Sequence, residues 1–465
     1  MQSWSMKRQI WKDSIEERRE RYREILSKSP LLEVPCILPG SSEVVIDTIA
    51  HYVTGPALYA YIDWVIHSAT KAGQKHLYFL ARDGYLMYHA AKIYCEENQI
   101  NLDLRYLYCS RYALRIPMYH LNREDAMEYI CRNGIHITPA RVLRRSGMDA
   151  AFCRKLAEKY FPQWNPDQEL NRQELSQLTE QLKKNDAFWE LCAAHSRGVY
   201  PEAEHYLIQE GLLDDVPYAL VDSGWIGSMQ KTLGQLIGRN LHGYYWGLYD
   251  LPEGAEKEAY SAYYFSPSAG ESEKIAFNNN LFEVLYSAPH GMTIGYRDGK
   301  PILGKEEPRQ VELIRRMEPA LMDYMRSVCQ SNTLPNTPTE EKEANENADR
   351  DRYRPIIREL FDCFMCHPIK EEAEVFGSIP FSDDIFAETD QRLAGPVSEE
   401  VLNSNHPMQK VMRTSGLKKE KEIVLPWYEG SAVLSSSNPD KHLKAYQNYK
   451  KLLTKRQERN WRNKT

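Results

Sequence analysis

Apolar and polar residues follow one another along the chain in the order typical of a sheet covered by helices. An apolar run at 76–81 predicts a strand, a polar loop at 82–84 ends it, and a helical stretch follows at 85–97. A second strand is predicted at 104–109, and it also ends in polar residues. Strand, polar loop, helix and strand in this order indicate a parallel α/β sheet.

The same pattern returns after a long helical interval. Residues 216–221 form an apolar run that ends in the polar segment 222–228, and a helix is predicted at 229–237. Residues 242–249 predict another strand, rich in aromatic side chains. The polar, helix-forming residues 118–213 are interpreted as an inserted helical unit. We therefore expect an α/β fold with a parallel Rossmann-like sheet, a helical insertion and a helical C-terminal region.

Changes of composition suggest five segments. Residues 7–24 carry seven basic and five acidic residues, which predicts a charged, solvated helix. An acidic stretch at 336–352 lacks large aliphatic residues and is interpreted as a linker. The predicted segments are a charged N-terminal helix at 1–44, the first part of the α/β core at 45–117, the insertion at 118–213, the second part of the core at 214–300, and a mainly helical region at 301–465 that contains the linker.

Composition and charge narrow the function classes. The 465 residues include 59 Lys and Arg against 65 Asp and Glu, a net charge of −6, which argues against a general nucleic-acid binder. The nine cysteines show no disulfide framework, and no run is long and apolar enough to span a membrane, so we expect a cytoplasmic protein. Residues 450–465 hold seven bases and one acid. This tail is either solvated or in peripheral contact with anionic lipid at the inner face of the membrane.

The candidate chemistry lies where the predicted strands end. Ligands of open α/β sheets bind outside the carboxyl ends of the strands, and parallel strands bring these ends to one edge. Three polar segments are therefore expected to gather there. They are Arg82-Asp83-Gly84, Ser110-Arg111 with Arg115 one helical turn later, and Asp222-Ser223-Gly224-Trp225-Ile226-Gly227-Ser228.

The third segment suggests a phosphate site. Gly224 and Gly227 permit close backbone approach, and Ser228 could cap the helix that follows. Free N–H groups at the helix start would then receive an anion. Asp222 could bind sugar hydroxyls or a hydrated Mg²⁺. The alternative is a tight structural turn with a capping serine.

Other charged residues extend this candidate site. Arg82 could bind a phosphate, and Asp83 could act as a general base or bind metal, although a surface ion pair or a helix cap would explain both. Arg111 and Arg115 could serve a polyanionic ligand. Glu283 is a further candidate base and His290 a secondary one, with a structured loop as the alternative.

Several motifs together resemble a known family. FLARDGYLM, YLYCSRYALRIP, VDSGWIGSMQKTL and LFEVLYSAPHG resemble the region that follows the phosphatase domain in bacterial polysaccharide-locus proteins labelled predicted HAD-superfamily hydrolases. The resemblance spans roughly residues 45–300. The HAD signature itself is absent, because Ala81 stands where the nucleophilic aspartate would be and an alanine cannot form an aspartyl-phosphate.

The strand order is also similar to that of phosphoribosyltransferases, in which a late loop holds the 5-phosphate of phosphoribosyl pyrophosphate. VDSGWIGS looks like that loop, with Ser223 in place of the usual second acid. The resemblance implies a glycosyltransferase that moves a phosphosugar, such as 5-phosphoribosyl, to a glycan or lipid-linked glycan acceptor during surface-polysaccharide biosynthesis. A HAD phosphatase or a glycosyltransferase would be its partner protein.

The resemblance and the residues together imply a set of roles. Asp83, Asp222 and Glu283 are the candidate catalytic residues, and Asp83 and Asp222 are the candidate ligands of Mg²⁺. The alternatives are a HAD-type hydrolase and a non-catalytic module that binds a partner protein. The residues expected to bind substrate are Arg82, Gly84, Ser110, Arg111, Arg115, Ser223, Gly224, Trp225, Gly227, Ser228 and His290.

Overall fold

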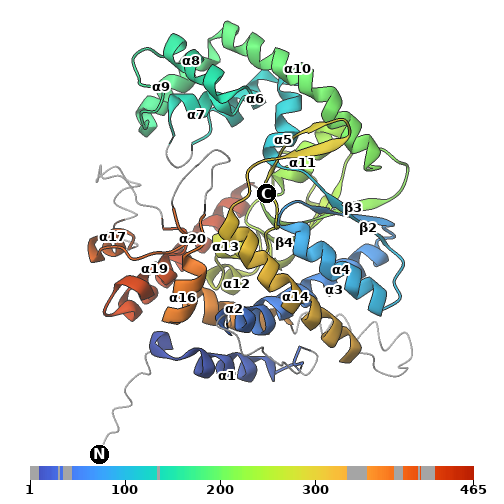
Figure 1. The fold of residues 1–465 in the computed structure, drawn as a ribbon, viewed down its shortest axis with the longest axis vertical. Helices are drawn as coiled ribbons and strands as arrows, with labels where there is room; N and C mark the ends of the chain where they lie inside the picture. The colour runs from blue at the N-terminus through green and yellow to red at the C-terminus, as the bar shows by residue number, and fades with distance from the viewer. Residues whose placement is uncertain are drawn as a thin grey trace, which may run out of the picture.

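A parallel sheet forms the centre of the protein. The computed structural model describes residues 10–29, 32–34, 44–133, 137–331, 353–381, 391–406, 409 and 425–464. Five parallel strands pair in the order β2-β1-β3-β4-β5 (Figure 1). They are β1 (His76–Leu80), β2 (Asp103–Leu107), β3 (Tyr218–Trp225), β4 (His242–Leu248) and β5 (Tyr260–Phe265). The predicted α/β class is confirmed.

Helices cover both faces of this sheet, because alternate side chains of each strand point to opposite faces. On one face, Leu77 and Phe79 of β1 lie in a core with α3 (Gly55–Lys71), α4 (Gly84–Glu97) and α14 (Pro308–Ser331). On the other face, Tyr78 and Leu80 lie in a core with α5 (Arg111–Arg115), α10 (Asp186–Gln209) and α11 (Ser228–Ile237). The result is a three-layer arrangement.

The strand order places a switch point beside β1. The chain leaves β1 through α4 toward β2 on one side, and β3 lies on the other side of β1. In such doubly wound sheets, the crevice that binds ligands opens at the carboxyl ends of the two strands where the order reverses. The carboxyl ends of β1 and β3 are therefore the first place to look for a site.

The helical insertion has its own core and forms the top of Figure 1. Leu143, Leu156, Leu178 and Phe188 are buried together in it. The later part of α10 returns to the sheet, where Tyr206 and Leu207 pack against it. The elements of the insertion are η3 (Ile116–Leu121), α6 (Arg123–Ile130), α7 (Pro139–Arg144), α8 (Ala150–Tyr160), α9 (Arg172–Lys183) and the first half of α10.

The C-terminal region is mainly helical, as predicted, and its helices at 370–377, 399–404 and 428–435 lie at the left of Figure 1. The predicted linker at 336–352 falls outside the described residues. After β3 the remaining elements are η4 (Lys257–Ala259), α12 (Glu271–Ile275), α13 (Asn279–Leu285), the antiparallel hairpin β6 (Thr293–Arg297) and β7 (Lys300–Leu303), the helical residues 353–361, η5 (Asp362–Cys366), α16 (Lys370–Gly377), α17 (Glu399–Ser404), α19 (Tyr428–Ser435) and α20 (Pro439–Lys464).

The N-terminal helix is less solvated than its composition predicted. Alpha helix α1 (Ile15–Leu26) follows η1 (Ile10–Lys12) and precedes α2 (Val44–Ile49) and η2 (Ala50–Thr54). Its Arg18 is buried and forms an ion pair with Glu372 of α16, with 3.1 Å between Nε and Oε1. Tyr22 and Leu26 are buried as well. A buried cation needs a paired anion, so α1 is fixed to the C-terminal region rather than free in solvent.

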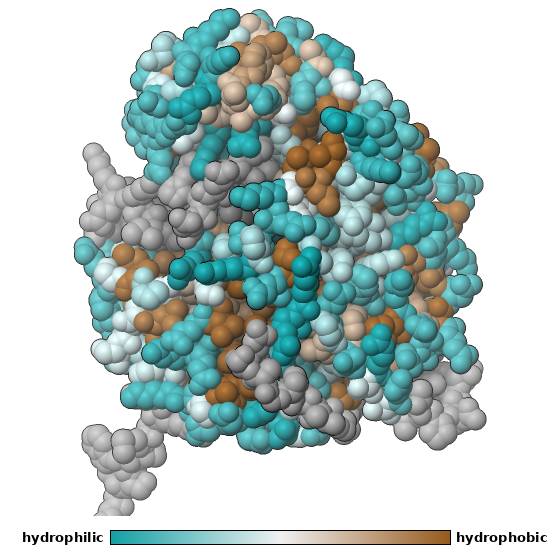
Figure 2. All heavy atoms as spheres, in the orientation of Figure 1, coloured by the Kyte–Doolittle hydropathy of each residue, from teal (hydrophilic) through white to brown (hydrophobic). Residues whose placement is uncertain are grey.

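The visible surface is mostly hydrophilic, with hydrophobic patches that are small and separated (Figure 2). Three of the exposed large hydrophobic residues lie near the carboxyl edge of the sheet or the hairpin beside it, namely Ile226, Ile294 and Leu303. Among the described residues, no helix is both long and apolar enough to cross a membrane.

Candidate functional site

The carboxyl ends of β1 and β3 bring two acidic residues together. Asp83 follows β1 directly and stands at the start of α4, where its side chain makes no capping hydrogen bond. It accepts instead a hydrogen bond from the Ser223 hydroxyl of β3. Asp222 precedes that serine and is 8% exposed. The prediction that segments distant in sequence meet at one edge is confirmed for these residues, and they meet at the switch point of the sheet.

The two carboxyl groups perturb each other. Burial raises the pKa of Asp222 well above its usual range, and the neighbouring charge of Asp83 raises it further. Burial also raises the pKa of Asp83. The hydrogen bond from Ser223 and the positive charges of Arg82 and Arg111 oppose that rise. Asp222 therefore keeps its proton to higher pH, and Asp83 ionises first as the pH rises.

Two exposed arginines border the acidic pair. Arg82 lies in the turn after β1, and Arg111 is the first residue of α5. Ser110, which was predicted to bind substrate, instead fixes this helix. Its hydroxyl accepts from the N–H of Ala113 at 3.0 Å and donates to the carbonyl of Thr293 at 2.7 Å. Because both interactions are internal, Ser110 positions Arg111 rather than facing a ligand.

A third carboxylate stands beside the pair. The Trp225 indole N–H donates to Glu283 of α13, with 2.6 Å between Nε1 and Oε1. The charge of Glu283 is close enough to raise the pKa of Asp222. The Trp225 ring packs between Phe277 and Phe282, with centroids 5.3 and 5.7 Å away. Trp225 thus holds a carboxylate at the site, and the predicted catalytic role of Glu283 stays a prediction.

The glycines of this segment have structural explanations that the sequence interpretation missed. Strand β3 extends through Trp225, so Asp222, Ser223 and Gly224 belong to the strand and not to a loop. Gly224 has a φ of +134°, and a Cβ there would lie 2.0 Å from the carbonyl oxygen of Gly247 in β4. The close approach is made by a neighbouring strand. No ligand is needed to explain this glycine.

Gly227 and Ser228 also differ from their predicted roles. Gly227 occupies the cap position of α11 with a φ of +74°, and a Cβ would lie 2.6 Å from the Tyr260 ring. Ser228 is the first residue of the helix and does not cap it. Gly84 similarly packs against β1, because its Cβ would lie 3.0 Å from the backbone carbon of Phe79. The first N–H groups of α11 remain as the candidate phosphate seat.

His290 is not available as a base. Its Nε2 lies 2.7 Å from the Tyr106 hydroxyl and its Nδ1 lies 2.8 Å from the carbonyl oxygen of Gly291. Burial lowers the pKa of His290, so the ring is neutral, with Nδ1–H donating and Nε2 accepting. The rings of Tyr106 and Tyr108 pack against it at 5.8 and 5.1 Å. No motif in the sequence pointed to these tyrosines as part of the site.

Arg115 lies away from the acidic pair. Its guanidinium stacks on the Tyr129 ring of α6 at 4.6 Å from the centroid. Arg115 and Arg111 are four residues apart at the two ends of α5, and only Arg111 acts on the pKa values of Asp83 and Asp222. The side chain of Arg115 packs against the insertion, and its predicted role in substrate binding stays a prediction.

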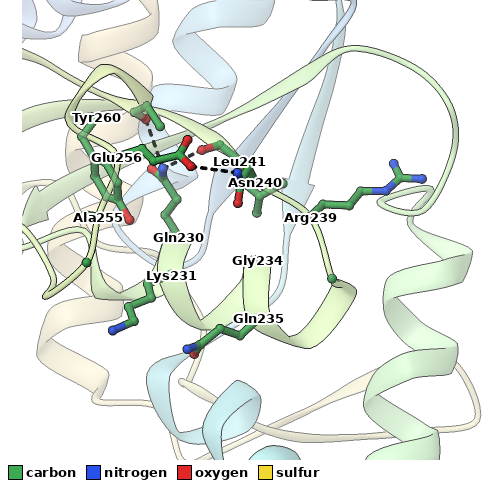
Figure 3. Close-up of a pocket in the computed structure, with 13 residues that line it drawn as sticks. Gln230, Lys231, Gly234, Gln235, Arg239, Asn240, Leu241, Ala255, Glu256 and Tyr260 are labelled. Carbon is green, nitrogen blue, oxygen red and sulfur yellow. Dashed lines mark hydrogen bonds between the residues drawn. The ribbon is translucent and has the colours of Figure 1, made fainter.

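One cavity beside the sheet lies away from the acidic pair. It has a volume of about 290 Å³ and runs along α11 toward the amino ends of β4 and β5 (Figure 3). Several of its polar groups are already hydrogen-bonded within the protein. The Lys231 amine donates to the carbonyl of Glu253 at 3.0 Å, and the Asn240 amide donates to Glu256 at 3.1 Å. Nothing in its lining points to chemistry.

The predicted magnesium site can be tested against the acidic pair. The described residues contain no group of three or more His, Cys, Asp or Glu side chains that could hold a metal ion. Mg²⁺ commonly takes one or two carboxylates from a protein and the rest of its ligands from water and substrate phosphates. The repulsion that raises the pKa of Asp222 is one that a divalent cation would relieve. Asp83 and Asp222 therefore fit Mg²⁺ bound together with a phosphorylated substrate.

No model of a known protein family matches the sequence, and no curated protein is significantly similar to it. The geometry of the carboxyl edge is therefore what bears on function.

Proposed function

We propose that the protein is a glycosyltransferase that transfers a 5-phosphoribosyl group from phosphoribosyl pyrophosphate to a glycan acceptor in surface-polysaccharide biosynthesis. One observation supports this more than any other. Two mutually repelling carboxyl groups, the half-buried Asp83 and the buried Asp222, lie at the switch point between β1 and β3. Two exposed arginines, Arg82 and Arg111, border them. Acids beside cations at this edge suit a ligand that carries both hydroxyl and phosphate groups.

The reaction assigns a role to each group. The bond between C1 of the ribose and the pyrophosphate oxygen breaks, and a bond from C1 to an acceptor oxygen forms. Arg82 and Arg111 neutralise the charge that grows on the leaving pyrophosphate. The first N–H groups of α11 bind the 5-phosphate. Asp83 and Asp222 would hold Mg²⁺, which supplies further positive charge when it is bound.

The acceptor must lose a proton as it attacks. Glu283 is the carboxylate left for this step, because the Asp pair is committed to the donor. The Trp225 N–H fixes its orientation at 2.6 Å. A positioned general base of this kind contributes a factor of roughly 10²–10⁴ to the rate. The proton moves from the acceptor hydroxyl to Glu283 as the new bond forms.

A lipid-linked acceptor would place the reaction at the inner face of the cytoplasmic membrane, with the protein bound there peripherally. A HAD phosphatase or another glycosyltransferase is the partner protein that the family resemblance suggests. Removal of the 5-phosphate from the product is the step that a phosphatase would supply.

The test is acceptor-dependent release of pyrophosphate. The purified chain is incubated with phosphoribosyl pyrophosphate, Mg²⁺ and synthetic lipid-linked glycans, and pyrophosphate is measured with and without acceptor. We expect Asp222→Asn to lose donor binding and turnover together. Glu283→Gln should keep donor binding and lose about 10²–10⁴-fold in turnover.

Asp215→Asn is the matched control. Asp215 is exposed and precedes β3 at the opposite edge of the sheet, so this variant should behave like the natural protein. Absence of pyrophosphate release with every acceptor would contradict the proposal. Release of phosphate from simple phosphomonoesters would favour a hydrolase instead.

A further inference from the structure

One face of α20 carries a continuous row of cations. With 3.6 residues per turn, side chains spaced by three, four or seven positions fall on one side of a helix. The row spans 22 residues, whose 21 rises of 1.5 Å give about 31 Å. We call it the α20 basic stripe, and its members are Lys441, Lys444, Lys451, Lys455, Arg459 and Arg462. All six are exposed.

The opposite face of α20 is fixed to the protein, so the stripe must point outward. Leu443 and Thr454 are buried, and the Tyr446 ring stacks on Tyr428 of α19 with centroids 4.3 Å apart. Lys450 lies on this inner face and pairs with the buried Glu429, with 2.6 Å between Nζ and Oε1. Lys450 is thus used internally, whereas the six cations of the stripe lie at the surface.

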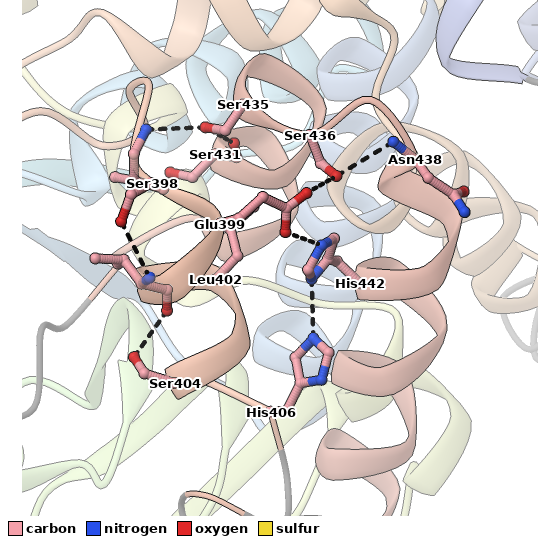
Figure 4. Close-up of polar contacts among 12 residues, drawn as sticks. Ser398, Glu399, Leu402, Ser404, His406, Ser431, Ser435, Ser436, Asn438 and His442 are labelled. Carbon is pink, nitrogen blue, oxygen red and sulfur yellow. Dashed lines mark hydrogen bonds and ion pairs between the residues drawn. The ribbon is translucent and has the colours of Figure 1, made fainter.

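The beginning of the helix is held by a chain of polar contacts (Figure 4). His442 is 1% exposed, and its Nε2 lies 2.9 Å from Oε2 of Glu399 in α17. Its Nδ1 lies 2.8 Å from Nε2 of His406. The second oxygen of Glu399 accepts from the Ser436 hydroxyl at 2.5 Å. These contacts set the rotation of α20 about its axis and therefore the direction of the stripe.

Four of the six cations of the stripe, namely Lys444, Lys451, Lys455 and Arg459, form no ion pair within the part of the chain that the structure describes. The acids of α20 flank the stripe. Asp440 is in the first turn, and Glu458 lies 3.8 Å from the buried Lys274 and also lines a hollow with Lys455 and Arg459. Glu271 of α12 is the one acid from another element that shares a hollow with the end of the stripe.

An exposed apolar side chain lies at the edge of the stripe. Leu452 is 58% exposed and stands three residues before Lys455, on the adjoining side of the helix. A cationic row with an apolar residue at its edge suits a bilayer of anionic lipids, where the ammonium groups meet phosphates and the leucine enters the acyl boundary. A nucleic acid would use the same cations but would leave Leu452 in water, and the whole chain carries a net charge of −6.

We propose that the α20 basic stripe binds the surface of an anionic lipid bilayer. The end of α20 also lies near the candidate site. Lys464 pairs with Asp250, which follows β4 at the carboxyl edge of the sheet, at 2.6 Å. Binding through the stripe would therefore bring this edge close to the lipid surface. This last consequence depends on the proposed function, whereas lipid binding itself does not.

The test is sedimentation of the full chain with vesicles, without any substrate. The protein should bind vesicles of phosphatidylcholine and phosphatidylglycerol at 0.1 M salt, leave them at 0.5 M salt, and not bind phosphatidylcholine alone. The triple variant Lys451→Gln, Lys455→Gln, Arg459→Gln should bind on the order of 100-fold more weakly, at about a fivefold loss per cation. Leu452→Ser should weaken binding roughly tenfold.

The matched control neutralises three exposed lysines of the insertion, Lys155→Gln, Lys183→Gln and Lys184→Gln, and should bind vesicles like the natural protein. Failure to bind anionic vesicles would overturn the proposal, as would an equal loss in the control triple. Tighter binding to a DNA duplex than to vesicles, with Leu452→Ser unchanged, would also overturn it. Because no substrate is present, these outcomes are independent of catalysis.

Discussion

Replacing Gly224 with alanine distinguishes a structural glycine from a ligand-binding one. A Cβ at this position would lie 2.0 Å from the Gly247 carbonyl oxygen, whereas ordinary contacts begin near 3.4 Å, so β3 and β4 would have to separate by 3.4 − 2.0 = 1.4 Å. Overpacking of this kind costs roughly 1–3 kcal/mol. The φ of +134° adds strain of roughly 1–3 kcal/mol for a residue with a side chain. We expect Gly224→Ala to lower the free energy of unfolding by about 4 kcal/mol.

Gly254→Ala is the matched control. Gly254 also has a positive φ, +72°, but nothing lies within 4 Å of its Cβ position. Only conformational strain remains there, at about 1–2 kcal/mol. Urea unfolding followed by tryptophan fluorescence suits the comparison, because Trp225 and Trp246 lie in β3 and β4. Equal midpoints for the two variants, with a loss of donor affinity in Gly224→Ala alone, would refute the structural explanation and restore the ligand-binding one.

Three further predictions follow from the same structure. Mg²⁺ affinity, measured by calorimetry with the pyrophosphate donor present, should fall as pH falls, because the raised pKa of Asp222 lets protons compete with the ion; affinity that is independent of pH between 5 and 8 would argue against this pair as ligands. Burial lowers the pKa of His51 from 6.5 to about 4. The unfolded chain therefore protonates His51 more readily than the folded protein, and about 3 kcal/mol of the free energy of unfolding should be lost as pH drops from 6.5 to 4. In urea unfolding, His51→Gln should lose less stability over this pH range than the natural protein. Trp225→Phe removes the donor to Glu283 and should reduce turnover at least roughly tenfold with donor affinity unchanged; a change confined to donor affinity would show that the indole serves the donor instead.

The sheet could be predicted from the sequence because its central strands are buried on both faces. Strands β1 and β3 are continuous apolar runs that end in charged or polar residues, and that pattern identified both their place and their carboxyl ends. Strand β5 was missed because its residues 260–265 are mostly tyrosine with serine and alanine, and it forms by pairing with β4. The β6–β7 hairpin was missed as well. Among the described residues its two strands pair with each other and not with the central sheet, so the pattern of that sheet does not reveal them.

The candidate site was only partly predictable. The sequence placed Asp83, Asp222 and Arg111 at one edge because parallel topology alone dictates this. It could not show that Gly224 serves a contact with Gly247, because a glycine required by a neighbouring strand looks the same in sequence as one required by a ligand. Partners far apart in sequence decide such cases.

His290 and Arg115 illustrate the same limit. The remaining nitrogen of His290, Nε2, is occupied by the hydroxyl of Tyr106, which is 184 residues away in the chain. The direction of Arg115 is fixed by Tyr129 of the insertion. Residue type and spacing suggest which side chains can bind an anion, and the packing of distant segments determines which of them remain free to do so.

Binding of the donor tests most directly whether the carboxyl edge of β1 and β3 is a phosphosugar site. Calorimetric titration of phosphoribosyl pyrophosphate with Mg²⁺ should show binding to the natural protein. The double variant Arg82→Gln, Arg111→Gln should bind at least roughly tenfold more weakly, because each arginine supplies charge-assisted hydrogen bonds to phosphate. Arg172→Gln, at an exposed position of the insertion, should bind like the natural protein. No binding to the natural protein, or equal binding by the double variant, would contradict the account.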